Sequence, residues 1–133
     1  MGHTTAAAFA RHTKGDAHII LCGRNRSTAE AIIASFSKCP RSQYKFVQSD
    51  VTMMRNVHTV TAGLLVTWLK LNYVFVTTGF VTLRGRDETS EGLDTKLALN
   101  YYTQWKFVYE LMPLMRKAKD AGEDTQVMSV LAA

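Results

Sequence analysis

The sequence predicts an α/β fold in which helices alternate with the strands of a mostly parallel sheet. The run from Ala17 to Cys22 contains five apolar residues and one histidine without alternation, as expected of a strand covered on both faces. Helical periodicity and short strand-like runs then take turns along the chain, which is the pattern of parallel strands joined by crossover helices. The 133 residues are 47% hydrophobic, enough for one core, so we expect one domain over residues 1–133.

The first half of the chain is expected to contain two helix–strand pairs. Alanine-rich residues 1–12 favour a helix, and Gly15 is a typical stop for it. After the strand at 17–22, Ser27 and Glu30 have the spacing of a capping box and predict a second helix that ends by Pro40. A short strand over 44–49 follows.

The second half repeats the alternation with longer helices. Apolar residues at helical spacing continue from Leu93 to Met115 and predict a long amphipathic helix that Gly122 ends. Its apolar residues are Leu93, Leu97, Tyr101, Trp105, Val108, Met112 and Met115. The other expected elements are a helix over 55–68, a strand over 72–78, a loop over 80–90 and a last strand over 126–131.

Composition and spacing argue against several function classes. The net charge is +5 and the pI about 9.4, but the basic residues are scattered without interleaved aromatics, which disfavours a nucleic-acid partner. Cys22 and Cys39 lie too far apart for a metal knuckle, and the four histidines show no ligand spacing, so no metal is expected. No apolar run approaches the roughly 20 residues of a membrane span, and no signal-peptide core is evident. We therefore expect a cytoplasmic protein with no membrane partner.

Polar residues follow two of the predicted strands. Arg24 and Asn25 come directly after the first strand, and Asp50 comes after the second. Ligands of open α/β sheets bind at the carboxyl ends of the strands, and the forked donors of a guanidinium suit a phosphate or carboxylate. Arg24 is therefore a candidate anion-binding residue, with a solvated surface arginine as the alternative.

The order of these elements resembles the short-chain dehydrogenase/reductase family. The features that carry the resemblance are a Gly-Arg-Asn turn at 23–25, Asp-Val at 50–51, a strand that ends in Gly79, and Leu-Asn at 99–100 in the long helix. It covers essentially the whole chain but only about the first half of a typical member. It implies a Rossmann-like three-layer αβα domain that lacks the family's first, central strand and its C-terminal half, so that the chain is truncated at both ends.

The resemblance implies a nicotinamide cofactor site around the first strand. Met1 and Gly2 match only the last two positions of the family's glycine-rich turn, with methionine in place of isoleucine. Arg24 falls where members place a basic residue against the adenosine 2′-phosphate, which implies NADP rather than NAD, and Asn25 lies beside it.

Further matches follow the next two strands. Asp50 and Val51 fall on the pair that contacts adenine in the family. The family's Asn-Asn-Ala-Gly motif corresponds to residues 76–79, where only Gly79 is retained.

The resemblance also assigns two catalytic positions. Asn100 falls on the helix asparagine of the family's catalytic tetrad, and Ser129 falls near its catalytic serine, with Val130 as the other candidate position. The catalytic Tyr-x-x-x-Lys of the family is expected about a dozen residues after that serine, beyond residue 133. Tyr102 and Lys106 match its spacing, but they precede the serine, so we interpret them as a surface pair.

These matches imply an NADP-dependent oxidoreductase that acts on a small carbonyl or alcohol substrate, present here as an incomplete and inactive chain. The alternative is a non-catalytic remnant that binds a nucleotide or another protein. In the family's strand order, the strands at 17–22 and 72–78 flank the absent strand. Either these two strands pair directly, or another chain supplies the absent strand, or the domain stays loose with open sheet edges. We expect the isolated chain to be marginally stable, with poor folding cooperativity. The sequence indicates neither the substrate nor the oligomeric state.

Overall fold

The computed structural model describes residues 2–36, 39–79 and 81–130. Met1, Phe80 and Leu131, which the predicted first helix, loop and last strand include, lie outside the described residues. The chain divides into two compact units, residues 1–49 and 50–133, and each is described by itself. The single domain over 1–133 stays a prediction.

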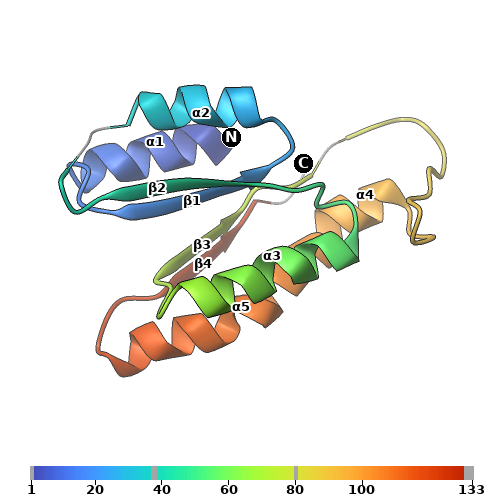
Figure 1. The fold of residues 1–133 in the computed structure, drawn as a ribbon. Coiled ribbons are helices and arrows are strands. Elements are labelled where there is room, and N and C mark those ends of the chain that lie inside the picture. The colour runs from blue at the N-terminus through green and yellow to red at the C-terminus, as the bar shows by residue number, and fades with distance from the viewer. Residues whose placement is uncertain (1, 37–38, 80, 131–133) are drawn as a thin grey trace. The chain divides into compact units, whose positions relative to one another are not determined.

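The first unit contains two helices and a two-stranded parallel sheet. Its elements are α1 (Gly2–His12), β1 (His18–Gly23), α2 (Arg26–Ala34) and β2 (Gln43–Gln48). β1 and β2 run parallel, with His18 opposite Gln43 and Gly23 opposite Gln48. Both helices lie on the same face of this sheet (Figure 1). The structure thus confirms the type and order of all four predicted elements.

The predicted stop of α1 is confirmed, but the predicted start of α2 is wrong. Lys14 and Gly15 have φ of 54° and 80°, and the Gly15 amide donates to the Ala10 carbonyl at 2.8 Å, which ends the helix. The N-cap of α2 is Asn25, whose Oδ1 accepts from the Thr28 amide at 3.1 Å. Because Asn25 is the extended residue before the helix, Ser27 lies inside the first turn and cannot cap it.

The expectation that β1 is buried on both faces is also wrong. Every residue of β1 is partly or fully exposed. The two helices of this unit cover only one face of the sheet, so an unbroken apolar run does not by itself secure burial on the other face. The small core under the helices contains Ala10, Ala29 and Phe36, and the Phe36 ring meets Tyr44 edge to face at 5.2 Å.

The second unit is a helix pair packed with another two-stranded parallel sheet. Its elements are α3 (Met54–Thr67), β3 (Tyr73–Val76), α4 (Thr95–Leu97), a π-helical turn η1 (Ala98–Tyr102), α5 (Thr103–Asp120) and β4 (Gln126–Ser129). Tyr73 lies opposite Gln126, and Val76 lies opposite Ser129. The long predicted helix exists, but η1 interrupts its first third. The spacing of the apolar residues does not distinguish a π-helical turn from an α-helical one.

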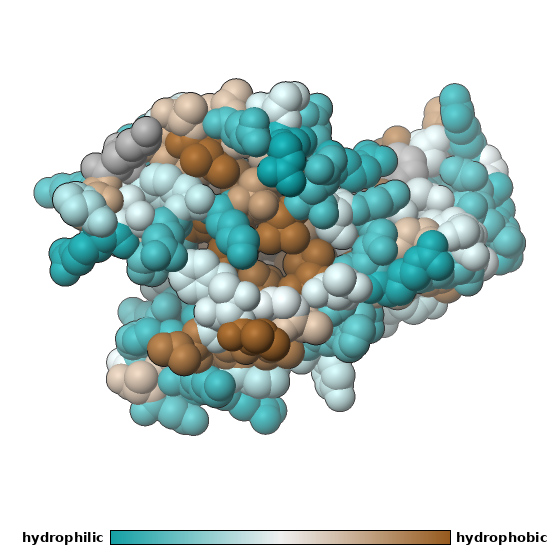
Figure 2. All heavy atoms as spheres, viewed as in Figure 1, coloured by the Kyte–Doolittle hydropathy of each residue, from teal (hydrophilic) through white to brown (hydrophobic). Residues whose placement is uncertain are grey.

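The buried face of α5 differs from the apolar stripe read from the sequence. Leu97, Tyr101 and Trp105 are 55%, 55% and 62% exposed, and of the predicted stripe within α5 only Met115 is fully buried. The face that packs inward consists of Thr103, Gln104, Phe107, Leu111, Leu114, Met115 and Ala118. Both sets have helical spacing, so periodicity alone cannot choose between them. Apolar surface also gathers over the helices of this unit in Figure 2.

The loop between β3 and α4 reaches back to start α3. The N-cap residue Met53 has no side chain that can cap, and the Glu91 carboxylate instead accepts from the amides of Met54 at 2.6 Å and Arg55 at 3.0 Å. These backbone hydrogen bonds, Arg55 first, lower the pKa of Glu91. A residue 36 to 37 positions away along the chain therefore supplies the cap.

Candidate functional site

The carboxyl end of β1 holds Arg24 in a fixed backbone position. The Ser49 amide donates to the Gly23 carbonyl at 2.8 Å, and the Gln48 side-chain amide donates to the Arg24 carbonyl at 3.1 Å. The start of α1, where Gly2 lies, is at this same end of the sheet (Figure 1). Two of the residues predicted to bind cofactor are therefore at one sheet edge of the first unit.

The guanidinium of Arg24 differs from that of its neighbour Arg26. Arg26 lies 5.4 Å from the Phe46 ring centroid and 3.8 Å from the Glu30 carboxylate, so its charge already has partners. The Arg24 side chain is exposed, and it enters none of the ion pairs formed among the described residues. Arg24 is thus the cation at this edge that an anionic ligand can engage without breaking an internal pair.

Asn25, also predicted to bind cofactor, has a structural contact of its own. Its Oδ1 accepts from the Thr28 amide at 3.1 Å and from the Ser27 hydroxyl at 2.8 Å. This capping fixes the turn that presents Arg24.

In the second unit, Asp50 and Val51 form a turn that is tied to the start of α5. Asp50 Oδ1 accepts from the amide and hydroxyl of Thr52, at 3.0 and 2.8 Å. The Val51 carbonyl accepts from the Thr103 hydroxyl at 2.5 Å, and Thr103 is completely buried. The residues that match the adenine-contacting pair therefore have a defined conformation rather than lying in a loose loop.

The end of β3 is tied to the π-helical turn that contains Asn100. The Thr78 hydroxyl donates to the Leu99 carbonyl at 2.9 Å, next to Asn100, which is half-buried. Gly79 follows with φ of 155°, a backbone conformation that favours glycine. The single glycine retained from the family motif is thus the position where the chain needs one.

Ser129 lies at the end of β4, where a buried glutamine joins both strands. The side chain of Gln104 is in the first turn of α5, and the residue is 4% exposed. Its Nε2 donates to the carbonyls of Thr78 at 2.8 Å and Val130 at 3.3 Å, and its Oε1 accepts from the Ser129 hydroxyl. Of the two positions considered for the serine, only residue 129 brings a hydroxyl to this point.

Four of the five predicted residues of the second unit, Val51, Gly79, Asn100 and Ser129, therefore gather at the carboxyl end of the β3–β4 sheet, and the fifth, Asp50, precedes Val51 in its turn. Sequence reasoning missed the residues that connect them, Thr78, Thr103 and Gln104. Thr103 and Gln104 continue, at helical spacing, the apolar row of Phe107, Leu111 and Leu114. Polar residues in such a row are the signal by which they could have been found. Gly2, Arg24 and Asn25 belong to the other unit.

The Tyr102–Lys106 pair has the surroundings of a surface pair. Tyr102 is exposed, and the ammonium of Lys106 donates to Glu110 at 2.7 Å. Glu110 also lies 3.0 Å from Nδ1 of His58 and accepts from the Thr61 hydroxyl, so this cluster fastens α3 to α5. Burial raises the pKa of Glu110, but the hydrogen bonds from Lys106, Thr61 and His58 and the charge of Lys106 outweigh it and lower the pKa to about 2.

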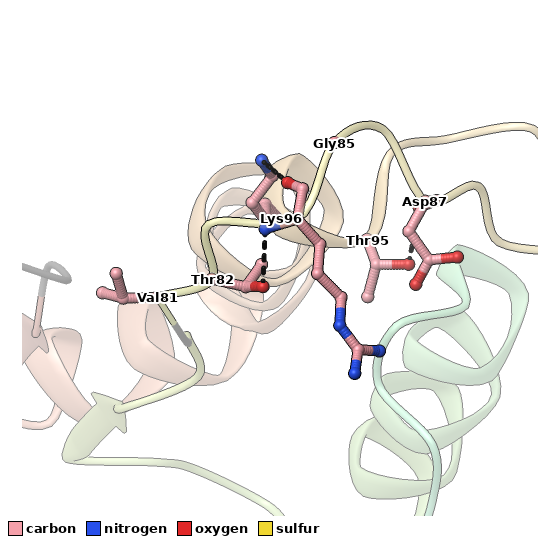
Figure 3. Close-up of a pocket in the computed structure, with 7 residues that line it drawn as sticks. Val81, Thr82, Gly85, Asp87, Thr95 and Lys96 are labelled. Atoms are coloured by element: carbon pink, nitrogen blue, oxygen red, sulfur yellow. Dashed lines mark hydrogen bonds between the residues drawn. The ribbon is translucent and has the colours of Figure 1, made fainter.

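A hollow of about 360 Å³ lies in the loop before α4 (Figure 3). The Thr95 hydroxyl donates to the Asp87 carbonyl at 2.8 Å, and the Lys96 ammonium donates to the Arg84 carbonyl at 3.2 Å. The lining of the hollow consists of Val81, Thr82, Arg84, Gly85, Asp87, Thr95 and Lys96, none of them a predicted site residue.

Within the described ranges, no group of three or more His, Cys, Asp and Glu side chains could hold a metal. None of the helices in these ranges has the length and apolar character of a membrane span.

Comparison with known proteins connects this fold to the oxidoreductases. No family model matches the chain. Oxidoreductase AN1596 of Emericella nidulans is 32% identical over 131 residues, 98% of this chain and 38% of that protein. Short-chain dehydrogenase/reductase SAT2 of Stachybotrys chartarum is 25% identical over 121 residues, 83% of this chain and 34% of that protein. The chain therefore spans about a third to two fifths of the length of these curated relatives.

Solved structures show the same fold. An NADH-dependent reductase A1-R′ complexed with NAD superposes with a TM-score of 0.72 over 96% of this chain and 53% of that one, at 18% identity. The RhlG/NADP complex of Pseudomonas aeruginosa gives 0.68 over 96% and 49%, at 16% identity. These matches confirm the α/β Rossmann-like fold. Together with the curated relatives, they confirm the resemblance to the short-chain dehydrogenase/reductase family, over part of the length of its members.

Proposed function

We propose that this chain forms the nucleotide-binding part of an NADP-dependent oxidoreductase of the short-chain dehydrogenase/reductase type. The observation that supports the proposal best concerns Arg24. Hydrogen bonds fix its backbone at the carboxyl end of β1, and its guanidinium forms no ion pair among the described residues. A phosphate monoester is a ligand that the forked donors of arginine fit well. The relatives described above are named as oxidoreductases, and two of the structural neighbours are complexes with NAD or NADP.

The family resemblance relates the candidate residues to different parts of such a cofactor. Arg24 would hold the 2′-phosphate, and Gly2, which adds no side chain at the start of α1, leaves the helix N-terminus accessible to the pyrophosphate. Asp50 and Val51 would contact the adenine, and Gly79 would allow close approach of the backbone. A bound nicotinamide supplies hydride transfer, Asn100 would help to organise a proton relay, and Ser129 would lie beside a carbonyl or alcohol group.

The experiment is calorimetric titration of the full chain with NADPH and with NADH. Replacing Arg24 by Ala should weaken NADPH binding by about 1.5–3 kcal/mol, the value of a charge-assisted hydrogen bond, and leave NADH binding nearly unchanged. Arg26→Ala is the matched control, because its guanidinium already has partners, and it should leave both affinities unchanged. Equal losses for both cofactors in Arg24→Ala, or no NADPH binding by the unmodified chain, would refute the proposal.

The activity of these 133 residues is a separate question. They contain no Tyr-x-x-x-Lys after Ser129, and Lys106 of the earlier matching pair is engaged by Glu110. An acid/base group of this kind contributes typically about 10²–10⁴-fold to rate, so we propose that the chain by itself does not turn over. Carbonyl reduction that disappears in Tyr102→Phe would show that the earlier pair is catalytic after all.

The second candidate function is a non-catalytic remnant that binds a nucleotide or another protein. The ion pair of Lys106 with Glu110 supports this function as much as it supports an inactive oxidoreductase, because it leaves Lys106 unavailable for catalysis in both. NADPH binding that Arg24→Ala does not weaken, with no turnover, would favour this remnant over the oxidoreductase.

A further inference from the structure

The hollow before α4 is framed by hydrogen bonds of the chain itself. The Lys96 ammonium donates to the Arg84 carbonyl at 3.2 Å, and the Thr95 hydroxyl donates to the Asp87 carbonyl at 2.8 Å. The Arg84 amide donates to the Thr82 hydroxyl at 3.1 Å. The loop is thus tied to the start of α4 at two points. The volume of about 360 Å³ falls within the range of small-molecule pockets.

The charged side chains of this loop divide into two groups. Four of them have internal partners: Arg86 pairs with Glu88 at 2.7 Å, Glu91 caps α3, and Asp94 accepts from three backbone amides. The amide of Asp87 does most to lower the pKa of Asp94, and the charge of Lys96 does least. The other three line the hollow and enter none of the ion pairs formed among the described residues; they are Arg84, Asp87 and Lys96.

The hollow has hydrogen-bond donors at one end and acceptors at the other. The Thr82 hydroxyl accepts from an amide and keeps its own proton to donate, and Lys96 has two ammonium protons besides the one that it gives to the loop. The Thr95 hydroxyl has given its proton to the Asp87 carbonyl, so its oxygen can only accept, like the Asp87 carboxylate. Figure 3 shows Thr82 and Lys96 on one side, and Thr95 and Asp87 on the other.

We propose that this hollow binds a small hydroxycarboxylate, with its carboxylate on the donors of Arg84, Lys96 and Thr82 and its hydroxyl on Asp87. The forked donors of arginine fit a carboxylate, and a carboxylate such as that of Asp87 accepts from a hydroxyl. Val81, 71% exposed, adds an apolar wall for a short hydrocarbon chain.

The charges of the lining select this ligand over two related ones. Arg84 and Lys96 are positive and Asp87 is negative, so a ligand with one negative charge neutralises the lining. An amino acid carries no net charge and leaves one positive charge unbalanced. A dicarboxylate would place its second anion against Asp87, and like charges in contact are costly.

The hollow shares no residue with the proposed cofactor-binding and catalytic positions. Its lining lies between residues 81 and 96, after Gly79 and before Asn100. The inference therefore goes beyond the proposed function and does not depend on nucleotide binding.

The test is an NMR titration of the full chain at pH 7 with 2-hydroxybutyrate, butyrate and 2-aminobutyrate. These probes share the carboxylate and the hydrocarbon chain and differ at C2, which carries a hydroxyl, no polar group or an ammonium. We expect saturable shifts of the Gly85 and Thr95 amide signals. 2-Hydroxybutyrate should bind about two- to tenfold more tightly than either other probe, as expected for one hydrogen bond. This comparison needs no variant.

Two variants test the two ends of the hollow. Arg84→Gln should weaken 2-hydroxybutyrate and butyrate alike, by about tenfold or more, because both lose a charge-assisted hydrogen bond. Arg86→Gln is the matched control, since its guanidinium already pairs with Glu88, and it should change both affinities by less than about threefold. Asp87→Ala should abolish the advantage of 2-hydroxybutyrate over butyrate, because the hydroxyl loses its acceptor.

Several results would overturn the proposal. They are equal affinities for 2-hydroxybutyrate and butyrate, tighter binding of 2-aminobutyrate, shifts confined to residues outside 81–96, no binding, or an Arg84→Gln variant that binds as tightly as the unmodified chain. Amide exchange of Met54 and Arg55, which Glu91 caps, shows whether the loop keeps its position in each variant. Since no nicotinamide cofactor is added, a failure of NADPH binding in the calorimetric experiment leaves these results unaffected, and the two failures can be told apart.

Discussion

Replacing Glu110 by Gln should weaken the packing of α3 on α5 more than any exposed charge removal in the chain. The Glu110 carboxylate is 15% exposed and holds three donors, the Lys106 ammonium at 2.7 Å, Nδ1 of His58 at 3.0 Å and the Thr61 hydroxyl. Its pKa falls from an ordinary 4.5 to about 2, because these hydrogen bonds and the Lys106 charge outweigh the opposing effect of burial.

The magnitude follows from that pKa. A depression of about 2.5 pKa units corresponds to at most about 3.4 kcal/mol of unfolding free energy, since one unit is about 1.4 kcal/mol. Because His58 is 68% exposed and Lys106 29% exposed, solvent screening reduces this figure, and we expect a loss of about 2 kcal/mol at pH 7. Because the pKa of Glu110 is lower in the folded chain, its ionised carboxylate adds its full share to the unfolding free energy only when the pH is above 4.5, the pKa in the unfolded chain. That contribution disappears as the pH falls through the folded value of about 2.

The assay is urea unfolding followed by tryptophan fluorescence at pH 7, 5 and 3. Both tryptophans, Trp68 and Trp105, lie in the second unit and so report on the helices in question. The difference between wild type and Glu110→Gln should be largest at pH 7 and shrink at pH 3. Glu30→Gln is the control, because its partner Arg26 lies 3.8 Å away on an exposed surface, and it should cost less than about 0.5 kcal/mol. A Glu110→Gln variant as stable as wild type at pH 7, or a pH-independent difference, would refute the reasoning.

Three further changes test the packing and the turns. Leu114→Ala should cost about 2–5 kcal/mol of unfolding free energy in the same urea assay, because Leu114 is 1% exposed, whereas Leu83→Ala at a fully exposed position should cost less than about 0.5 kcal/mol. Thr103→Val should cost about 1–3 kcal/mol, because it leaves a carbonyl of the 50–51 turn without its buried donor, and amide exchange in that turn should accelerate; an unchanged exchange rate would contradict this. Asn25→Ala should cost about 1 kcal/mol and speed amide exchange in the first turn of α2, and a larger effect from Ser27→Ala would show that the cap is misassigned.

Residue patterns within single segments predicted the fold class, whereas most of the candidate site came from the family resemblance and stays a prediction. Alanine-rich, periodic and β-branched runs gave the type and order of the helices and strands, because propensity and periodicity are properties of a few consecutive residues. The parallel pairing followed from their alternation. Arg24, which comes directly after β1, and Gly79, three residues beyond the end of β3, could be named because strand ends are visible in the sequence.

Only the tertiary structure decided which surfaces and partners these segments use. Periodicity allowed two faces of α5, and contact with α3 and β3 selected the one that buries Leu114 and exposes Trp105. Three sets of hydrogen bonds join residues that lie 25 to 52 positions apart. They are the cap of α3 by Glu91, the bond from Thr103 to the Val51 carbonyl, and the bonds of Gln104 to Thr78 and Ser129. Such pairs carry no local signature, because a hydrogen bond depends on which atoms the folded chain brings together rather than on the spacing of residues along it.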